Sequence, residues 1–107
     1  DYMTYNYVIT MVSDINEAKL IAKNLVTKHL AACVNIVPSV TSVYEWKGEV
    51  CSESELMVFA KTRSELFEEV KKEILSHHSY DLPAVVSIPV EDGHKPFLQW
   101  VDEQCKK

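Results

Sequence analysis

Two adjacent histidines, His77 and His78, are the side chains of this sequence best suited to bind a metal, and Asp81 follows closely. Imidazole nitrogens and a carboxylate oxygen are donors that Cu²⁺ and Zn²⁺ accept. Neighbouring residues of a helix point about 100° apart, so both imidazoles reach one ion only where the helix unwinds. We predict a divalent-metal site formed by His77, His78 and Asp81.

A structural role for both histidines is the alternative. They lie three and four residues after Ile74, so they can continue the apolar stripe of a helix. As cations at the end of that helix they would also interact favourably with its dipole. Other donors are weaker candidates. The acidic residues are more typical of solvated surface charges, and the cysteines of unpaired thiols. These weaker candidates are Glu53, Glu55, Glu91, Asp92, Cys33 and Cys51.

Composition excludes several classes of function. The net charge is −5 and Arg63 is the only arginine, whereas nucleic-acid binding needs clustered basic residues. No apolar run approaches the roughly 20 residues of a membrane-spanning helix. Three cysteines without CxxC spacing favour a reducing, cytoplasmic setting. Motifs of a catalytic triad, a phosphate-binding loop or an HExxH helix are missing, so we predict a protein that is not an enzyme.

Hydrophobic periodicity predicts four strands and three helices in one domain spanning residues 1–107. Asp14 is placed to cap the first helix, whose apolar face includes His29, and Thr62 to Glu65 match a capping box before the second. Pro96 suits the first turn of the last helix. The predicted elements are a strand at 5–12, a helix at 15–30, a hairpin at 31–62, a helix ending near 77–78, a strand at 84–90 and a terminal helix.

The hairpin is too long for a domain of this size. A strand from Cys33 to Trp46 would span about 46 Å at roughly 3.3 Å per residue, whereas a compact chain of this length is about 34 Å across. Gly48 supplies the positive φ of a tight turn, and Pro38 predicts a bulge. Alternation places one set of side chains on a common face: Val34, Ile36, Val40, Tyr44 and Trp46.

The order βαββαβ with a terminal helix predicts an α+β, ferredoxin-like sandwich. Its helices cover one face of the sheet, while the strands are apolar on both faces. An exposed apolar face of that size is usually an interaction site. We therefore predict an obligate homo-oligomer.

An ordered set of motifs resembles the CutA family over about residues 7–101. The motifs are Ala31-Ala32-Cys33-Val34-Asn35-Ile36, Pro38, Ser42-x-Tyr44-x-Trp46-x-Gly48, Lys61-Thr62, His78-x-Tyr80-x-x-Pro83 and Trp100. The resemblance implies a cytosolic homotrimer, similar in architecture to PII signalling proteins. It also implies a role in tolerance of copper or other divalent cations, and Cu²⁺ binding.

Three positions, Ser79, Asp81 and Thr10, depart from the family pattern. The family commonly reads H-P-Y-E-x-P, where this chain has His78-Ser79-Tyr80-Asp81-Leu82-Pro83, and Thr10 stands where some relatives carry a metal-binding cysteine.

The family motifs also suggest a cleft between subunits. Tyr44, Trp46, Lys61 and Tyr80, with Asp81, are expected to hold a small anionic ligand there, or alternatively to pack the interface. A metal-tolerance homotrimer is thus the first reading, and a PII-like module with a small ligand or protein partner in the cleft is the alternative.

Overall fold

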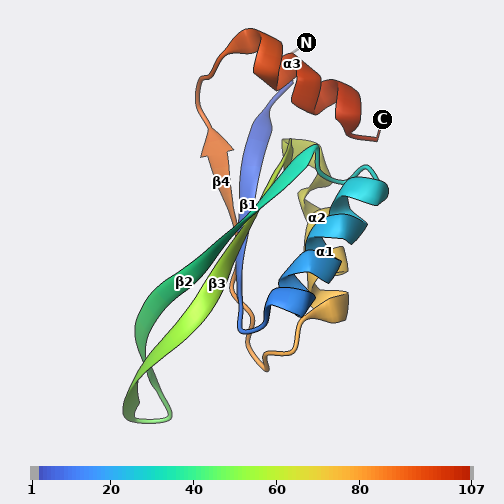
Figure 1. The fold of residues 1–107 in the computed structure, drawn as a ribbon. Coiled ribbons are helices and arrows are strands. Elements are labelled where there is room, and N and C mark those ends of the chain that lie inside the picture. Colours follow the sequence, from blue (N-terminus) through green and yellow to red (C-terminus); the bar gives the residue numbers. More distant parts are fainter. Residues whose placement is uncertain (1–2, 107) are drawn as a thin grey trace.

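A single four-stranded antiparallel sheet organises the computed structural model, which describes residues 3–106 (Figure 1). Its strand order is β2-β3-β1-β4, the arrangement of a ferredoxin-like sandwich, as predicted. The elements are β1 (Tyr5–Val12), α1 (Ile15–Thr27), β2 (Cys33–Trp46), β3 (Glu49–Arg63), a 3₁₀ turn (Ser64–Leu66), α2 (Phe67–His77), β4 (Val85–Val90) and α3 (Lys95–Gln104).

Helices α1 and α2 lie side by side on one face of the sheet, and α3 crosses one end of it (Figure 1). The core lies between the helices and the sheet, because each helix turns an apolar stripe toward the strands. Its largest fully buried aliphatic side chains are Val8, Val12, Ile21, Leu25, Val58, Val70, Ile74 and Val101. No helix of the described residues is long and apolar enough to cross a membrane.

The two helix starts differ in how well the sequence predicts them. Asp14 caps α1 as expected, accepting hydrogen bonds from the amides of Asn16 and Glu17 at 2.9 and 3.1 Å. The predicted capping box at Thr62 is wrong. The Thr62 hydroxyl is buried and donates to the carbonyl of Leu30 at 2.6 Å, and the 3₁₀ turn leads into α2 without a side-chain cap.

His29 was expected on the apolar face of the first helix. Instead it lies beyond the last residue of α1, is exposed, and has a φ of 58°. The helix has ended by Lys28, whose amide bonds back to the carbonyl of Asn24. The apolar periodicity of the sequence therefore continues to His29, two residues beyond Thr27, the last residue of the helix.

The β2–β3 hairpin extends well past the helical layer (Figure 1). The principal extents of the chain are 48, 25 and 22 Å, so one axis is about twice the others, in agreement with the length argument. Trp46 pairs with Glu49 across a two-residue turn, in which Lys47 and Gly48 have φ of 51° and 82°. Positive φ at both positions is typical of the tight turn that matches strand twist.

A bulge at Pro38–Ser39 reverses the faces of β2. Val37 pairs with Met57 but Val40 pairs with Glu55, so β2 carries one extra residue there. Because side chains alternate along a strand, one extra residue moves every later side chain to the opposite face. The bulge at Pro38 is confirmed, but the expected common face of β2 is wrong.

Before the bulge, Val34 and Ile36 pair with Ala60 and Val58 on the helix-covered face. After it, Tyr44 and Trp46 lie on the uncovered face.

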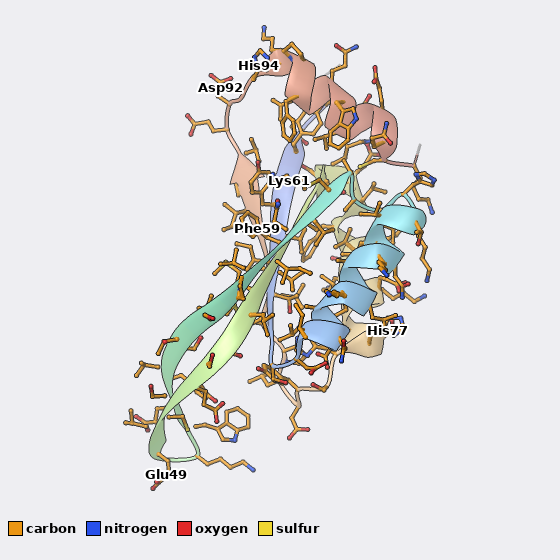
Figure 2. The ribbon with its side chains drawn as sticks, in the orientation of Figure 1. Glu49, Phe59, Lys61, His77, Asp92 and His94 are labelled. Carbon is orange, nitrogen blue, oxygen red and sulfur yellow. The ribbon has the colours of Figure 1, made fainter. Side chains whose placement is uncertain are left out.

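The face of the sheet opposite α1 and α2 is apolar and open. Val86 and Ile88 of β4 are 51% and 48% exposed, and Val37 is 40% exposed. The register brings Ile9 and Phe59 next to them, and Figure 2 shows Phe59 pointing away from the helices. This surface, Ile9, Val37, Phe59, Val86 and Ile88, is called the open face below.

Candidate functional site

His78 lies inside the chain, since its side chain is 0% exposed. It follows the last residue of α2, where the backbone becomes extended and turns the ring toward β1. The amide of Tyr80 donates to Nδ1 at 3.2 Å, and Nε2 lies 2.9 Å from the carbonyl of Met11 and 3.1 Å from the hydroxyl of Thr10. Both ring nitrogens are therefore engaged in fixing the loop after α2.

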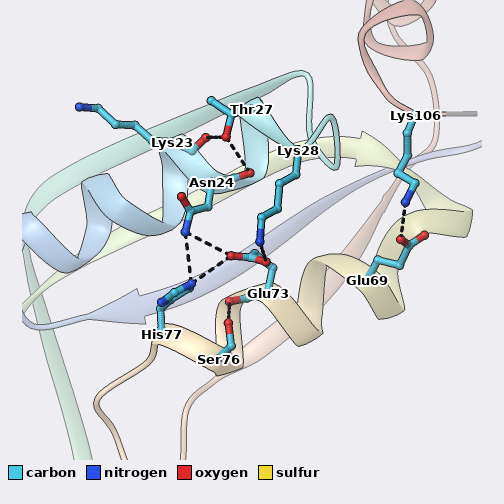
Figure 3. A network of polar contacts seen from close by, with 9 residues as sticks. All are labelled: Lys23, Asn24, Thr27, Lys28, Glu69, Glu73, Ser76, His77 and Lys106. Atoms are coloured by element: carbon cyan, nitrogen blue, oxygen red, sulfur yellow. Dashed lines mark hydrogen bonds and ion pairs between the residues drawn. The ribbon is translucent and has the colours of Figure 1, made fainter.

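His77 points the other way, into a polar network between α1 and α2 (Figure 3). Its Nε2 lies 3.1 Å from Glu73 Oε2 and 3.2 Å from the side-chain nitrogen of Asn24. The other oxygen of Glu73 forms an ion pair with Lys28 at 2.7 Å. His77 keeps a side-chain exposure of 33%, so solvent can reach its imidazole.

The hydrogen bond from Lys28 lowers the pKa of Glu73 below its ordinary value, against a smaller opposing effect of burial. Glu73 therefore carries a negative charge at neutral pH. A carboxylate and an imidazole four residues apart on one helix face make a two-donor arrangement for a divalent cation. Sequence reasoning missed Glu73, although its spacing of four residues from His77 was the available signal.

The predicted trio of His77, His78 and Asp81 is not gathered at one place. His77 faces α1, His78 is buried against β1, and Asp81 lines a pocket on the hairpin side. Within residues 3–106, no three His, Cys, Asp or Glu side chains are grouped so that they can hold a metal ion. A metal site that uses all three residues stays a prediction.

A pocket of about 540 Å³ lies between the hairpin and the loop after α2. It is lined by Tyr44, Trp46 and Tyr80, as the proposed cleft requires, and also by Glu53, Glu55 and Asp81. The fourth predicted cleft residue, Lys61, lies elsewhere. Its ammonium is 5.6 Å from the ring of Tyr7 and 5.5 Å from that of Phe97, near α3.

Figure 2 shows Lys61 toward the end of the sheet crossed by α3, far from the hairpin tip at Glu49. Within one chain, three of the four predicted cleft residues therefore line the pocket, and the fourth, Lys61, lies far from it.

Two tyrosines hold two of the pocket's carboxylates. The hydroxyl of Tyr44 donates to Glu53 at 2.7 Å, and that of Tyr80 donates to Glu55 at 2.6 Å. The hydrogen bond to Glu53 raises the pKa of Tyr44 to about 12. Burial, and then the bond to Glu55, raise the pKa of Tyr80 above its usual value. Both phenols thus remain protonated donors at neutral pH.

A family model described as CutA1 divalent ion tolerance protein matches residues 6–104. The chain belongs to the CutA family. The matched residues include both the His77–Glu73 pair and the pocket. The resemblance to the CutA family that the sequence motifs indicated is confirmed.

Relatives in the CutA family support the same assignment. A divalent-cation tolerance protein CutA of Archaeoglobus fulgidus is 43% identical over 99 residues, which cover 92% of this chain and 96% of that protein. The structure of the divalent cation tolerance protein (Cut A1) from Thermus thermophilus superposes with a TM-score of 0.91 at 38% identity, covering 95% and 99% of the two chains.

CutA1 from Oryza sativa superposes with a TM-score of 0.93 at 32% identity, covering 97% of this chain and 95% of that one.

Proposed function

We propose that this chain is a divalent-cation tolerance protein that binds Cu²⁺ or another divalent cation at His77 and Glu73, a partly exposed imidazole beside a largely buried carboxylate. The observation that carries the proposal is their geometry. Nε2 of the partly exposed His77 imidazole and Oε2 of the ionised Glu73 carboxylate lie 3.1 Å apart on one helix face. Family membership supports the class of ion, and the mixed nitrogen and oxygen donors suit Cu²⁺.

Binding at this pair is expected to be weak. Two side chains supply fewer donors than the four of a typical closed metal site, so water must complete the coordination shell. Lys28 also holds one oxygen of Glu73 and places a positive charge near the ion. Weak binding suits a protein that responds to an excess of cation better than one that retains a permanent cofactor.

Calorimetric titration with Cu²⁺ tests the pair directly. His77→Ala and Glu73→Gln are each expected to weaken binding about tenfold or more, equivalent to roughly 1.4 kcal/mol. His94→Ala is the matched control, since His94 is an exposed histidine before α3 and is expected to leave the affinity unchanged. Equal Cu²⁺ affinity in the wild type and all three variants would exclude the site.

We propose further that the working form is a homotrimer in the cytoplasm. The open face supports assembly, because a neighbouring subunit packed on it would remove this apolar surface from water. The three free cysteines suit a reducing compartment. Sedimentation equilibrium is expected to give three times the mass of one chain.

Ile88→Glu on the open face is expected to dissociate the trimer. Leu20→Glu places the same charge at a similarly exposed residue, 47% against 48%, on the outer side of α1, and is expected to leave the trimer intact. A wild-type chain that sediments as a folded monomer would overturn the assembly. Binding, not catalysis, is the activity we propose.

A ligand-binding module of the PII type is the second candidate, and the pocket between the hairpin and the loop after α2 favours it. Within one chain, Glu53, Glu55 and Asp81 line that pocket and Lys61 lies elsewhere, so the lining favours a cationic ligand over the small anion first expected. Its lining fits a cationic ligand that also carries hydrocarbon.

A further inference from the structure

The pocket on the hairpin combines three aromatic rings with three carboxyl groups. Tyr44, Trp46 and Tyr80 supply the rings, and Glu53, Glu55 and Asp81 supply the acids. No lysine, arginine or histidine lines it among the residues that the structure describes. Tyr44 and Trp46 reach this position only because the bulge turns them to the open side of the sheet, where Met11 also lies.

Glu53 and Glu55 are fixed in place but only half satisfied as acceptors. One oxygen of each accepts a phenol hydroxyl, at 2.7 and 2.6 Å, and the other has no donor within residues 3–106. Glu55 is only 9% exposed, so its remaining exposure opens onto the pocket that it lines. A buried ionised carboxylate with unused acceptor capacity is stabilised by a charged N–H donor.

The aromatic rings of the pocket favour, among cations, those that also carry hydrocarbon groups. The face of an indole attracts an ammonium group, and Trp46 already has the ammonium of Lys47 at 5.8 Å from its ring centroid. A bare metal ion fits less well, since the volume of about 540 Å³ far exceeds one ion and no three donors are grouped for it within residues 3–106. The apolar part of a ligand would contact Met11 and the ring of Tyr80.

We propose that this pocket binds a linear aliphatic polyamine, with its ammonium groups on Glu53 and Glu55 and its methylene chain along the aromatic rings. The assignment rests on the second candidate function, the ligand-binding module, and is independent of the His77–Glu73 metal pair. Three carboxyl groups match a ligand of two or three positive charges, and the elongated hairpin gives the chain a surface to lie along.

Calorimetric titration of the full chain with spermidine tests the assignment. Glu55→Gln and Glu53→Gln are each expected to weaken binding about tenfold or more, because each removes a charged partner of an ammonium group. Glu68→Gln, an acid with 77% of its side chain exposed on α2, is the matched control and is expected to change the affinity less than about twofold. Circular dichroism checks the fold of each variant. Glu53 is exposed, so its variant remains informative if the Glu55 variant fails to fold.

Three further titrations separate the proposal from its competitors. Tetramethylammonium lacks N–H donors and Mg²⁺ lacks hydrocarbon, so both are expected to bind at least about tenfold more weakly than spermidine. Cu²⁺ affinity is expected to be unchanged in Glu53→Gln, and spermidine affinity unchanged in His77→Ala, so either proposal can fail alone. Spermidine binding that is absent, that equals Mg²⁺ binding, or that is indifferent to both pocket variants would overturn the assignment.

Discussion

Replacing the buried histidine after α2 is expected to cost far more stability than replacing its neighbour. His78→Ala removes a side chain with no exposed surface and leaves the amide of Tyr80 and the carbonyl of Met11 without their imidazole partner. A buried polar group without a partner costs about 1–3 kcal/mol, so two of them give about 2–6 kcal/mol, and the cavity adds to that cost. Domains are typically stable by only about 5–15 kcal/mol.

His77→Ala provides the comparison within the same dipeptide. His77 is partly exposed and its Nε2 contacts Glu73 Oε2 at 3.1 Å, and Glu73 keeps its bond to Lys28 without it, so the loss is expected to be about 1 kcal/mol or less. Urea unfolding at pH 7, followed by circular dichroism at one fixed protein concentration, measures both free energies of unfolding. The concentration is held constant because assembly adds to apparent stability.

A third variant identifies the bonds responsible. In His78→Gln, the side-chain amide can take the place of Nε2 and donate to the Met11 carbonyl, so about 1 kcal/mol is expected to return. Equal losses for His77→Ala and His78→Ala would refute the reasoning. If His78→Gln lost as much stability as His78→Ala, ring packing and not hydrogen bonding would account for the contribution of His78 to the free energy of unfolding.

Three smaller effects are also expected. Glu73→Gln should lower the free energy of unfolding at pH 7 by under about 1 kcal/mol, because Lys28 holds the folded carboxyl at a lowered pKa. That stabilisation is present above the unfolded carboxyl pKa of about 4.3 and is lost as the pH falls through the folded value, so wild type and variant should converge in acid urea titrations. Glu53→Gln should move the pKa of Tyr44 from about 12 toward 10.0, which NMR of labelled tyrosine would detect, and no movement would contradict the hydrogen bond. Thr62→Val should cost about 1–3 kcal/mol in thermal unfolding by leaving a buried carbonyl unpaired, and a neutral result would contradict that bond.

The helices, strands and turns of this fold could be predicted from the sequence because local chemistry determines them. Asp14 caps a helix through its own side chain, Gly48 supplies a positive φ, and Pro96 fits a first helical turn. The length of the hairpin also follows from counting residues. Each of these depends on a few neighbouring positions and on covalent geometry.

The contents of the candidate site depended on distant partners and were harder to predict. Adjacent histidines look equivalent in the sequence, yet the backbone becomes extended between them and sends His77 to α1 and His78 to β1. Lys61 and Trp46 belong to one hairpin, but they lie toward opposite ends of a long chain axis.

The bulge was the remaining source of error. Pro38 signals an irregularity, but the sequence does not say whether it adds one residue or breaks the strand. The difference decides which face carries Tyr44.

That extra residue at Pro38–Ser39 separates the hairpin into two stretches that differ in how closely they pack against the core. In the inner stretch, before the bulge, Val34 and Ile36 pack against the core, so a substitution at either position disturbs core packing. In the outer stretch, Tyr44 and Trp46 have little contact with the core, so their replacement can alter what the tip recognises without unfolding the domain. The tip can thus be redesigned as a recognition surface while the scaffold beneath it is left intact.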